Sequence, residues 1–227
     1  GYEYGINLNT IKQSQSMFAR RAYELMASNT AVISNFSRGL RINFGDLVVS
    51  SDYESRIHTS LSKFKSLLRE NKYNGLRKVL SENTYRHRGQ YILSKICTDY
   101  EFNEVKKTVL FIGLVNDKSD INRITDNTTR QQNILQKTIF VSNNNQLLKK
   151  KNVLSEGDLI RNIDQIVADF DYFIVINSMD YFGANCVHDM TLVDEFFDFD
   201  IVTKLNYYQQ HKETIKLNNE QNCKDYE

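Results

Sequence analysis

The sequence predicts an α/β protein of two Rossmann-like units with mainly parallel sheets. Short apolar runs alternate with longer segments whose apolar residues repeat at helical spacing, an order typical of parallel sheets flanked by helices. At 227 residues, the chain has room for one or two domains. A polar stretch near residues 98–107 separates two such series. We therefore expect one unit over 1–103, a second over 104–208 and a polar, frayed tail over 209–227.

Three strands are expected in the first unit, at residues 4–9, 31–34 and 47–50. A helix starting near Ser16 joins the first two strands, and its apolar residues fall on one face. Asn29 follows that helix, as expected of a residue that tolerates the left-handed conformation at a helix end. Two more helices are expected, one over residues 52–68 with Asp52 as its cap and one over 85–100.

The second unit repeats the alternation, with strands expected at residues 108–114, 138–141 and 172–176. Helices are expected at residues 120–135 and 159–170. Ser155 and Asp158 have the spacing of a capping box just before the second of these helices. The acidic and aromatic run at residues 194–200 is expected to end a helix and enter a strand with alternately buried aromatic residues.

Composition excludes several classes of protein. A net charge of +1 argues against a nucleic-acid binder, and no stretch has the roughly 18 apolar residues of a membrane span. The three cysteines are scattered and the four histidines lack zinc-like spacing, which fits a reducing compartment and a cytoplasmic location. Proline is absent from the chain. Because the sequence opens with Gly1, we expect the true N-terminus to lie upstream.

The segment from Ser16 to Glu24 contains three kinds of group that a nucleotide-sugar site requires. A helix N-terminus and arginine side chains favour a diphosphate, and a carboxylate can hold a ribose diol. Ser16 lies at the expected helix start, Arg20 and Arg21 lie in its first turns, and Glu24 is one turn further on. The alternative is a solvated helix face carrying a marginal salt bridge between Arg20 and Glu24.

The amino-acid sequence of this region resembles that of a known family. The run from Met17 to Gly39 reads MFARRAYELMASNTAVISNFSRG. It is similar to the pattern T-M-F-x-R-R-x-F-E-L-L-A-x-G-T-P-V-I-S-x-Y-S of the spore-protein CgeB-like glycosyltransferases, which are two-lobed GT-B enzymes of the family 1 type. Residues 83–88, NTYRHR, resemble the family's H-T-Y-x-H-R. The resemblance covers roughly residues 4–100, and it departs from the pattern at Asn29, Ala31 and Asn83.

The resemblance implies a role for each candidate residue. Glu24 matches the acidic residue that contacts the donor ribose, and Ser16, Arg20 and Arg21 would face the diphosphate. Two further donor-binding residues, Asn35 and Ser37, would lie near the base or the sugar, in the loop after the second strand. A GT-B lobe of this kind requires no cofactor. The acceptor-binding lobe that precedes it in the family is not part of this sequence, and the catalytic residues stay unassigned.

The second unit resembles a glycosyltransferase family 2 domain of the GT-A type. Residues 180–185, DYFGAN, are similar to the end of the pattern D-D-D-D-Y-Y-G-P-N. That motif holds Mg²⁺ or Mn²⁺, which binds the donor diphosphate. Only Asp180 remains of the acidic residues, because Asn177, Ser178 and Met179 stand in the other positions. We therefore expect a degenerate or incomplete domain, with a metal at Asp180 only if this domain is active.

These resemblances imply a fragment of a glycosyltransferase that acts in cell-surface polysaccharide or teichoic-acid-like synthesis. Its expected partners are a nucleoside diphosphate sugar, with a UDP-sugar favoured, and a glycan or polyol-phosphate acceptor. No nucleic acid and no membrane span are expected, whereas peripheral membrane association is left open. The alternative is a non-catalytic nucleotide-sugar-binding or scaffolding remnant. An unrelated nucleotide-binding protein is disfavoured, since the sequence has no glycine-rich phosphate loop.

Overall fold

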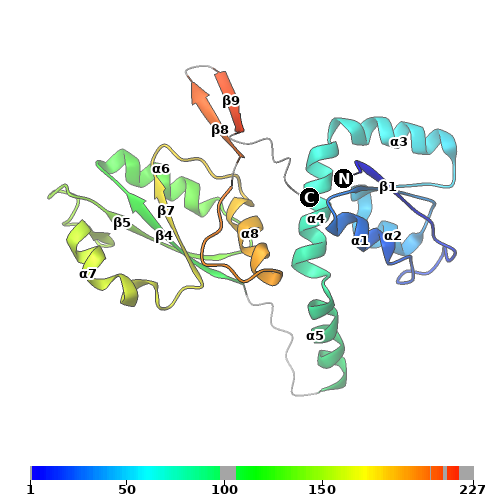
Figure 1. Ribbon diagram of the computed structural model, residues 1–227, viewed down its shortest axis with the longest axis horizontal. Coiled ribbons are helices and arrows are strands. Elements are labelled where there is room, and N and C mark those ends of the chain that lie inside the picture. Colours follow the sequence, from blue (N-terminus) through cyan, green and yellow to red (C-terminus); the bar gives the residue numbers. More distant parts are fainter. Residues whose placement is uncertain (1, 98–105, 205, 212–213, 220–227) are drawn as a thin grey trace. The chain divides into compact units, whose positions relative to one another are not determined.

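The computed structural model describes residues 2–97, 106–204, 206–211 and 214–219 (Figure 1). The chain divides into two compact units, Gly1–Glu104 and Val105–Glu227. Each unit contains a parallel sheet with helices packed against it, so the predicted α/β class is confirmed.

The first unit is built on a parallel sheet of three short strands in the order β1-β2-β3. The strands are β1 (Tyr4–Asn7), β2 (Ala31–Ser34) and β3 (Val48–Ser50). Ile6 pairs with Ile33, which in turn pairs with Val49. The carboxyl ends of the strands therefore lie at one edge of the sheet, where Asn7, Ser34 and Ser50 are aligned.

Helices cover both faces of this sheet (Figure 1). The helices of this unit are α1 (Arg21–Ala27), α2 (Arg38–Phe44), α3 (Glu54–Ser66), α4 (Leu68–Glu82) and α5 (Tyr85–Ile96), and α5 contributes no residue to either core. Side chains of α1, α2 and α4 pack with Val32 and Val48, whereas side chains of α3 pack with Ala31 and Val49. Strand residues alternate between the two faces, which is why neighbouring apolar residues enter different cores.

Several expectations for the first unit need correction. α1 begins at Arg21 rather than near Ser16, because residues 10–20 form an extended loop whose turn is bonded to the Ser14 hydroxyl. Asp52 does not cap α3, since Tyr53 occupies that position and the Asp52 carboxylate bonds elsewhere. The helices α2 and α4 were not predicted. Asn29 does adopt the left-handed conformation, with φ 52°. Residues 98–100 of the last expected helix lie outside the described residues.

The second unit contains a four-stranded parallel sheet in the order β6-β5-β4-β7. The strands are β4 (Thr108–Leu114), β5 (Leu135–Val141), β6 (Val153–Leu154) and β7 (Tyr172–Asn177). The chain moves from β4 to β5 on one side and later returns to β7 on the other side of β4. Right-handed crossovers in opposite directions place their helices on opposite faces. The boundary between β4 and β7 is therefore the topological switch point of this sheet.

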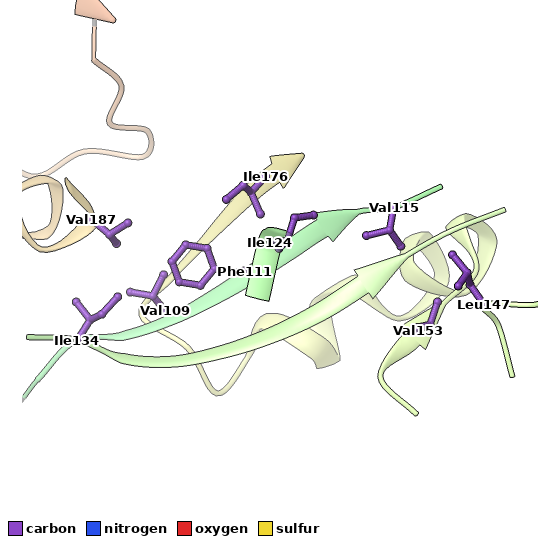
Figure 2. Packing of buried hydrophobic residues seen from close by; sticks show 9 residues of the cluster. All are labelled: Val109, Phe111, Val115, Ile124, Ile134, Leu147, Val153, Ile176 and Val187. Atoms are coloured by element: carbon purple, nitrogen blue, oxygen red, sulfur yellow. The ribbon is translucent and has the colours of Figure 1, made fainter. Parts of the chain in front are cut away.

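The packing agrees with that topology. α6 (Lys118–Thr129) and α8 (Cys186–Thr191) contribute Ile124 and Val187 to a core with Phe111 of β4. Figure 2 shows this core extending along one face of β4, from Ile134 and Val187 at one end to Leu147 and Val153 at the other. α7 (Glu156–Val167) covers the opposite face, where its apolar side chains meet Leu110 and Ile112.

The second unit also departs from expectation in three places. The helix expected at 120–135 is α6, which ends at Thr129, and the next strand begins already at Leu135. No strand follows the acidic and aromatic run in residues 196–204, and Phe196 and Phe197 are exposed there. The expected frayed tail contains a hairpin of β8 (Asn206–His211) and β9 (Thr214–Asn219). Half of the capping box predicted for α7 is confirmed, since the Ser155 hydroxyl accepts from the Asp158 N–H. The Asp158 carboxylate accepts from the Ser155 hydroxyl and not from the Ser155 backbone.

Candidate functional site

Polar side chains gather at the carboxyl edge of the first sheet. Asn7 and Ser34 end the first two strands, and Asn9 and Asn35 follow them in the adjoining loops. We call these four residues the amide cluster. In open α/β sheets, ligands bind outside the carboxyl ends of the strands. The amide cluster therefore occupies the position at which this fold places a binding site.

Asn9 and Asn35 fix the loops on either side of the cluster. The Asn9 backbone N–H donates to Asn35 Oδ1 at 2.8 Å, and Asn35 Nδ2 donates to the Asn9 carbonyl at 2.9 Å. Asn9 Nδ2 also donates to Ser34 Oγ at 2.9 Å. These reciprocal bonds join the loop after β1 to the loop after β2, so the edge has a defined shape without any ligand.

Asn7 has spare hydrogen-bonding capacity. Its side chain is fully buried, and Nδ2 donates to Ser34 Oγ at 3.1 Å, while Oδ1 has no partner among the described residues. Exchanging the two ends of the amide would satisfy the oxygen and leave the nitrogen without a partner. Because a buried polar atom without a hydrogen bond is costly, this amide favours a buried water beside it.

The loop from residue 10 to residue 20 passes over the start of α2. The Arg38 N–H donates to the Lys12 carbonyl at 2.8 Å. A Cβ at Gly39 would lie 2.9 Å from the carbonyl oxygen of Gln15, closer than real Cβ contacts allow. Glycine at position 39 therefore permits this close approach of the two backbones. Ser16 lies exposed in the same loop and not at a helix start.

Arg20 and Arg21 directly follow Ala19, a residue that is bonded to the amide cluster. The Ala19 N–H donates to Asn9 Oδ1 at 2.8 Å, and the two arginines follow directly at the start of α1. Arg20 Nε forms an ion pair with Glu24 Oε1 at 2.7 Å, and its Nη1 donates to the Tyr85 hydroxyl at 3.3 Å. All of these charged side chains are exposed.

The electrostatic surroundings of Arg20 keep it charged. Tyr85 and then Glu24 raise the pKa of the Arg20 guanidinium above its ordinary value. Arg20 and Glu24 are thus the salt bridge on a solvated face that the sequence offered as the alternative. Exposed pairs of this kind are weak. A diphosphate with stronger, bidentate hydrogen bonds can therefore compete for the guanidinium.

The structure gives the two remaining candidates different environments. Asn35 belongs to the amide cluster. Ser37 is fully buried and is the N-cap of α2, where its hydroxyl accepts from the Leu40 N–H at 3.4 Å. Among the candidate residues, Asn35 is bonded to Asn9 at the edge, and Arg20 and Arg21 follow Ala19, whose N–H is bonded to Asn9. Glu24 contacts Arg20, Ser37 caps α2, and Ser16 lies in the loop.

Sequence reasoning missed Asn7 and Asn9 as site residues. Both were assigned simply to an alternating strand, although asparagine is disfavoured in strands. Two asparagines at alternate positions, both turned inward, were the available signal. Asp52 was also missed. Its carboxylate accepts from the Phe36 N–H and pairs with Lys12 at 2.9 Å, and these bonds, Lys12 first, lower the pKa of Asp52 below its ordinary value.

The carboxyl edge of the second sheet holds Asp180. Its Oδ2 accepts from the Asn177 N–H at 2.9 Å, and its carbonyl accepts from Asn127 Nδ2 at 2.8 Å. Asn177 Oδ1 in turn accepts from the Met179 N–H. The carboxylate of Asp180 thus closes the turn after β7.

Asp120 joins the segments that follow β4 and β7 at the same edge. Its side chain is buried, and Oδ2 accepts from the Asn116 N–H at 2.9 Å. The Ser178 hydroxyl and then the Asn116 N–H lower the pKa of Asp120 below its ordinary value. Asp117 is the N-cap of α6, and bonds from the Asp120 N–H and then the Ser119 side chain lower its pKa also. Both carboxylates are occupied within the protein.

The donor set at this edge does not fit a divalent cation. Mg²⁺ and Mn²⁺ require several oxygen ligands, usually including more than one carboxylate. Asp180 is flanked by neutral side chains, and Asp120 is already bonded to backbone N–H groups. Among the described residues, no group of three or more histidine, cysteine, aspartate or glutamate side chains is arranged to hold a metal ion.

Comparison with models of known protein families, with curated proteins and with solved structures finds no match to this chain. The residues and their geometry are therefore what supports any functional assignment. Within the described ranges, no helix combines the length and the apolar character needed to cross a membrane.

Proposed function

We propose that the first unit binds a nucleoside diphosphate sugar at the carboxyl edge of its sheet, as the donor half of a glycosyltransferase. The amide cluster is the observation that carries this proposal. It lies at the carboxyl ends of parallel strands, it is braced by Asn9 and Asn35, and Asn7 retains a buried amide atom without a partner. A pair of arginines begins the neighbouring helix.

Each part of the donor has a candidate partner. Arg20 and Arg21 are assigned to the diphosphate, because guanidinium groups bind phosphate oxygens with two parallel hydrogen bonds. Glu24 is assigned to the ribose hydroxyls, which a carboxylate accepts as in dinucleotide-binding folds. When the diphosphate engages Arg20, the Glu24 carboxylate is released from its ion pair. Asn35 is assigned to the base or the sugar.

The proposed reaction is transfer of the sugar to a glycan or polyol-phosphate acceptor during cell-surface polysaccharide or teichoic-acid-like synthesis in the cytoplasm. The resemblance of residues 17–39 to the CgeB-like glycosyltransferases supports this choice of substrate class. A UDP-sugar is the favoured donor. No step is assigned to a metal ion, because the residues around Asp180 do not form a suitable donor set.

A second candidate function is a non-catalytic nucleotide-sugar-binding or scaffolding protein. The carboxyl edge of the second sheet favours it, since Asp120 and Asp180 are engaged with the backbone of their own unit. In this alternative the first unit still binds the nucleotide, and the second unit has a structural role. Transfer activity, measured with an acceptor present, separates the two candidates.

Calorimetric titration of the full chain with UDP and with a panel of nucleoside diphosphate sugars tests the donor site. Glu24→Ala is expected to weaken UDP binding about tenfold or more, because hydrogen bonds to charged groups contribute about 1.5–3 kcal/mol. The matched control is Glu70→Ala, which removes an exposed carboxylate from α4 of the same unit. Equal affinities for the two variants, or no binding by the folded wild-type chain, would refute the assignment.

A further inference from the structure

Helix α5 turns its polar face toward the protein and its apolar face toward solvent. Its partly buried residues are His87, Gln90 and Ser94, which lie on one face at spacings of three and four. None of its twelve residues is buried. A surface helix in a globular protein normally turns its apolar face inward and its polar face to solvent. In α5 the inward face is the polar one.

The outward face of α5 is an apolar stripe. Tyr85, Ile92 and Ile96 lie along it and are 80%, 54% and 72% exposed. Gly89 lies on the same stripe, and a Cβ at this position would meet no atom within 4 Å. The stripe is therefore continuous and open along the length of the helix. We call it the α5 stripe.

Basic residues flank the α5 stripe on both sides. Lys95 lies on one side, with its ammonium over the Tyr91 ring, and Arg86 lies on the other, while the Arg88 guanidinium stacks on Tyr23 of α1. The twelve residues of α5 include no acidic side chain. Tyr91 and Leu93 are exposed beside them. An exposed apolar stripe bordered by arginine and lysine, with tyrosine at its margin, is the composition of helices that lie in a membrane interface.

The size of the helix argues against a protein partner on this face. Twelve residues form a helix about 18 Å long and about 10 Å wide, whose footprint is about 200 Å². A stable protein–protein interface covers about 800 Å² on each partner. A lipid interface has no such minimum, because burial of a few apolar side chains adds to the attraction between basic residues and anionic headgroups.

We propose that α5 docks this protein on an anionic membrane surface, with the α5 stripe buried among the lipid headgroups and Arg86 and Lys95 facing their negative charges. This role is inferred from α5 and does not rest on the proposed donor site. It names the element and the lipid chemistry that would hold the protein at the surface, and the inverted polarity of α5 is its physical reason.

Gly89 offers a sharp test, because a side chain at this position meets open space. Gly89→Gln, Gly89→Glu and Gly89→Lys are compared by cosedimentation of the full chain with phosphatidylcholine vesicles that contain phosphatidylserine. A charge near an anionic surface changes binding about fivefold. Relative to Gln, we expect Glu to bind about fivefold more weakly and Lys about fivefold more tightly.

The apolar contribution is tested with Ile92→Gln/Ile96→Gln. Its control is Ile42→Gln/Ile160→Gln, which removes two similarly exposed isoleucines from other helices. We expect only the α5 variant to lose binding. Phosphatidylcholine vesicles alone, and salt raised to about 0.5 M, are expected to abolish wild-type binding. Circular dichroism verifies that each variant is folded.

Two outcomes would overturn the proposal. One is a wild-type chain that does not bind the phosphatidylserine vesicles, or α5 variants that bind like the controls. The other is self-association in sedimentation velocity that depends on Ile92 and Ile96 and occurs without vesicle binding, which would assign the α5 stripe to a second copy of the chain.

Discussion

The carboxyl edges of the two sheets have the same place in the fold but opposite chemistry. At the first edge the amide cluster braces two loops, and a buried amide atom of Asn7 is left without a partner among the described residues. At the second edge the carboxylates of Asp120 and Asp180 are bonded to backbone N–H groups of their own unit. The first edge retains a buried amide atom without a partner, whereas the carboxylates of the second edge are satisfied by the protein itself.

Topology alone would favour the second edge. The order in which the chain adds strands to the second sheet reverses between β4 and β7, and ligands bind at such a point in open α/β sheets. In the first sheet, the chain adds the described strands one after another in the order β1-β2-β3, so their order does not reverse. The comparison teaches that a fold supplies a location, whereas the side chains at that location determine whether a ligand can be held.

The largest effects are expected from substitutions in the two cores, each of which should lower the unfolding free energy of its own unit. Phe111→Ala removes a fully buried ring from β4, and we expect a loss of about 3–5 kcal/mol from the unfolding free energy of the second unit. Leu40→Ala in α2 is expected to cost the first unit about 2–5 kcal/mol. Hydrogen exchange with mass spectrometry assigns each loss to a unit.

Each variant is the control for the other. Phe111→Ala should accelerate exchange in β4, β5 and β7 and leave β1 and β2 protected, whereas Leu40→Ala should do the reverse. Loss of protection in both units from either substitution would mean that the chain unfolds as one cooperative structure, and the comparison between independent edges would fail.

An intermediate effect is expected at the second edge. Asp120→Ala removes the acceptor of the Asn116 N–H, and we expect a loss of about 1–3 kcal/mol in urea unfolding. The control is Asp126→Ala, which removes an exposed carboxylate from the same helix. Similar losses for the two variants would show that the buried carboxylate does not hold this edge together.

The carboxylates of Asp117 and Asp120 are expected to make the stability of the second unit depend on pH in acid. Hydrogen bonds lower the pKa of Asp117 and Asp120 in the folded protein, so the folded state favours their ionised forms. Their stabilisation is therefore complete above the unfolded pKa of about 3.9 and is lost as pH falls through the lower folded values. Asp120→Asn should flatten the dependence of stability on pH below about 4. An unchanged slope would contradict the assignment.

The smallest expected effect concerns Ser37, which the sequence assigned to the donor. Because its hydroxyl caps α2, Ser37→Ala is expected to lower stability by about 1 kcal/mol and to leave UDP affinity unchanged. Ser155→Ala removes the equivalent cap of α7 and should cost a similar amount. Thermal unfolding and calorimetry measure the two quantities. A fall in affinity with unchanged stability would return Ser37 to the donor site.

The fold was largely predictable from local patterns. Strands such as residues 31–34 and 172–176 are short apolar runs, and their lengths and positions agree with β2 and β7. Asn29 and Ser155 were predicted because helix ends depend on the residue beside them. Ser16 shows the limit of such reasoning, since the Ser14 turn and the close approach at Gly39 hold its segment in a loop.

Misplaced elements had signals that were weak or ambiguous. The hairpin of β8 and β9 is polar at many positions, so its composition indicated a frayed tail. The aromatic residues after Asp194 alternate as a buried strand would, yet Phe197 is exposed. In both cases composition was a poor guide, because strand formation depends on pairing, which the polarity of a segment does not reveal.

The sequence by itself determined the α/β class and the alternation of strands and helices, and it supplied the candidate residues that we propose for phosphate and ribose. Only the tertiary structure decided which polar groups meet. Asn9 and Asn35 are 26 residues apart in sequence, and their mutual hydrogen bonds form only when β1 and β2 are paired. Periodicity records the local environment of each residue, whereas a binding edge depends on long-range contacts that the pairing of strands creates.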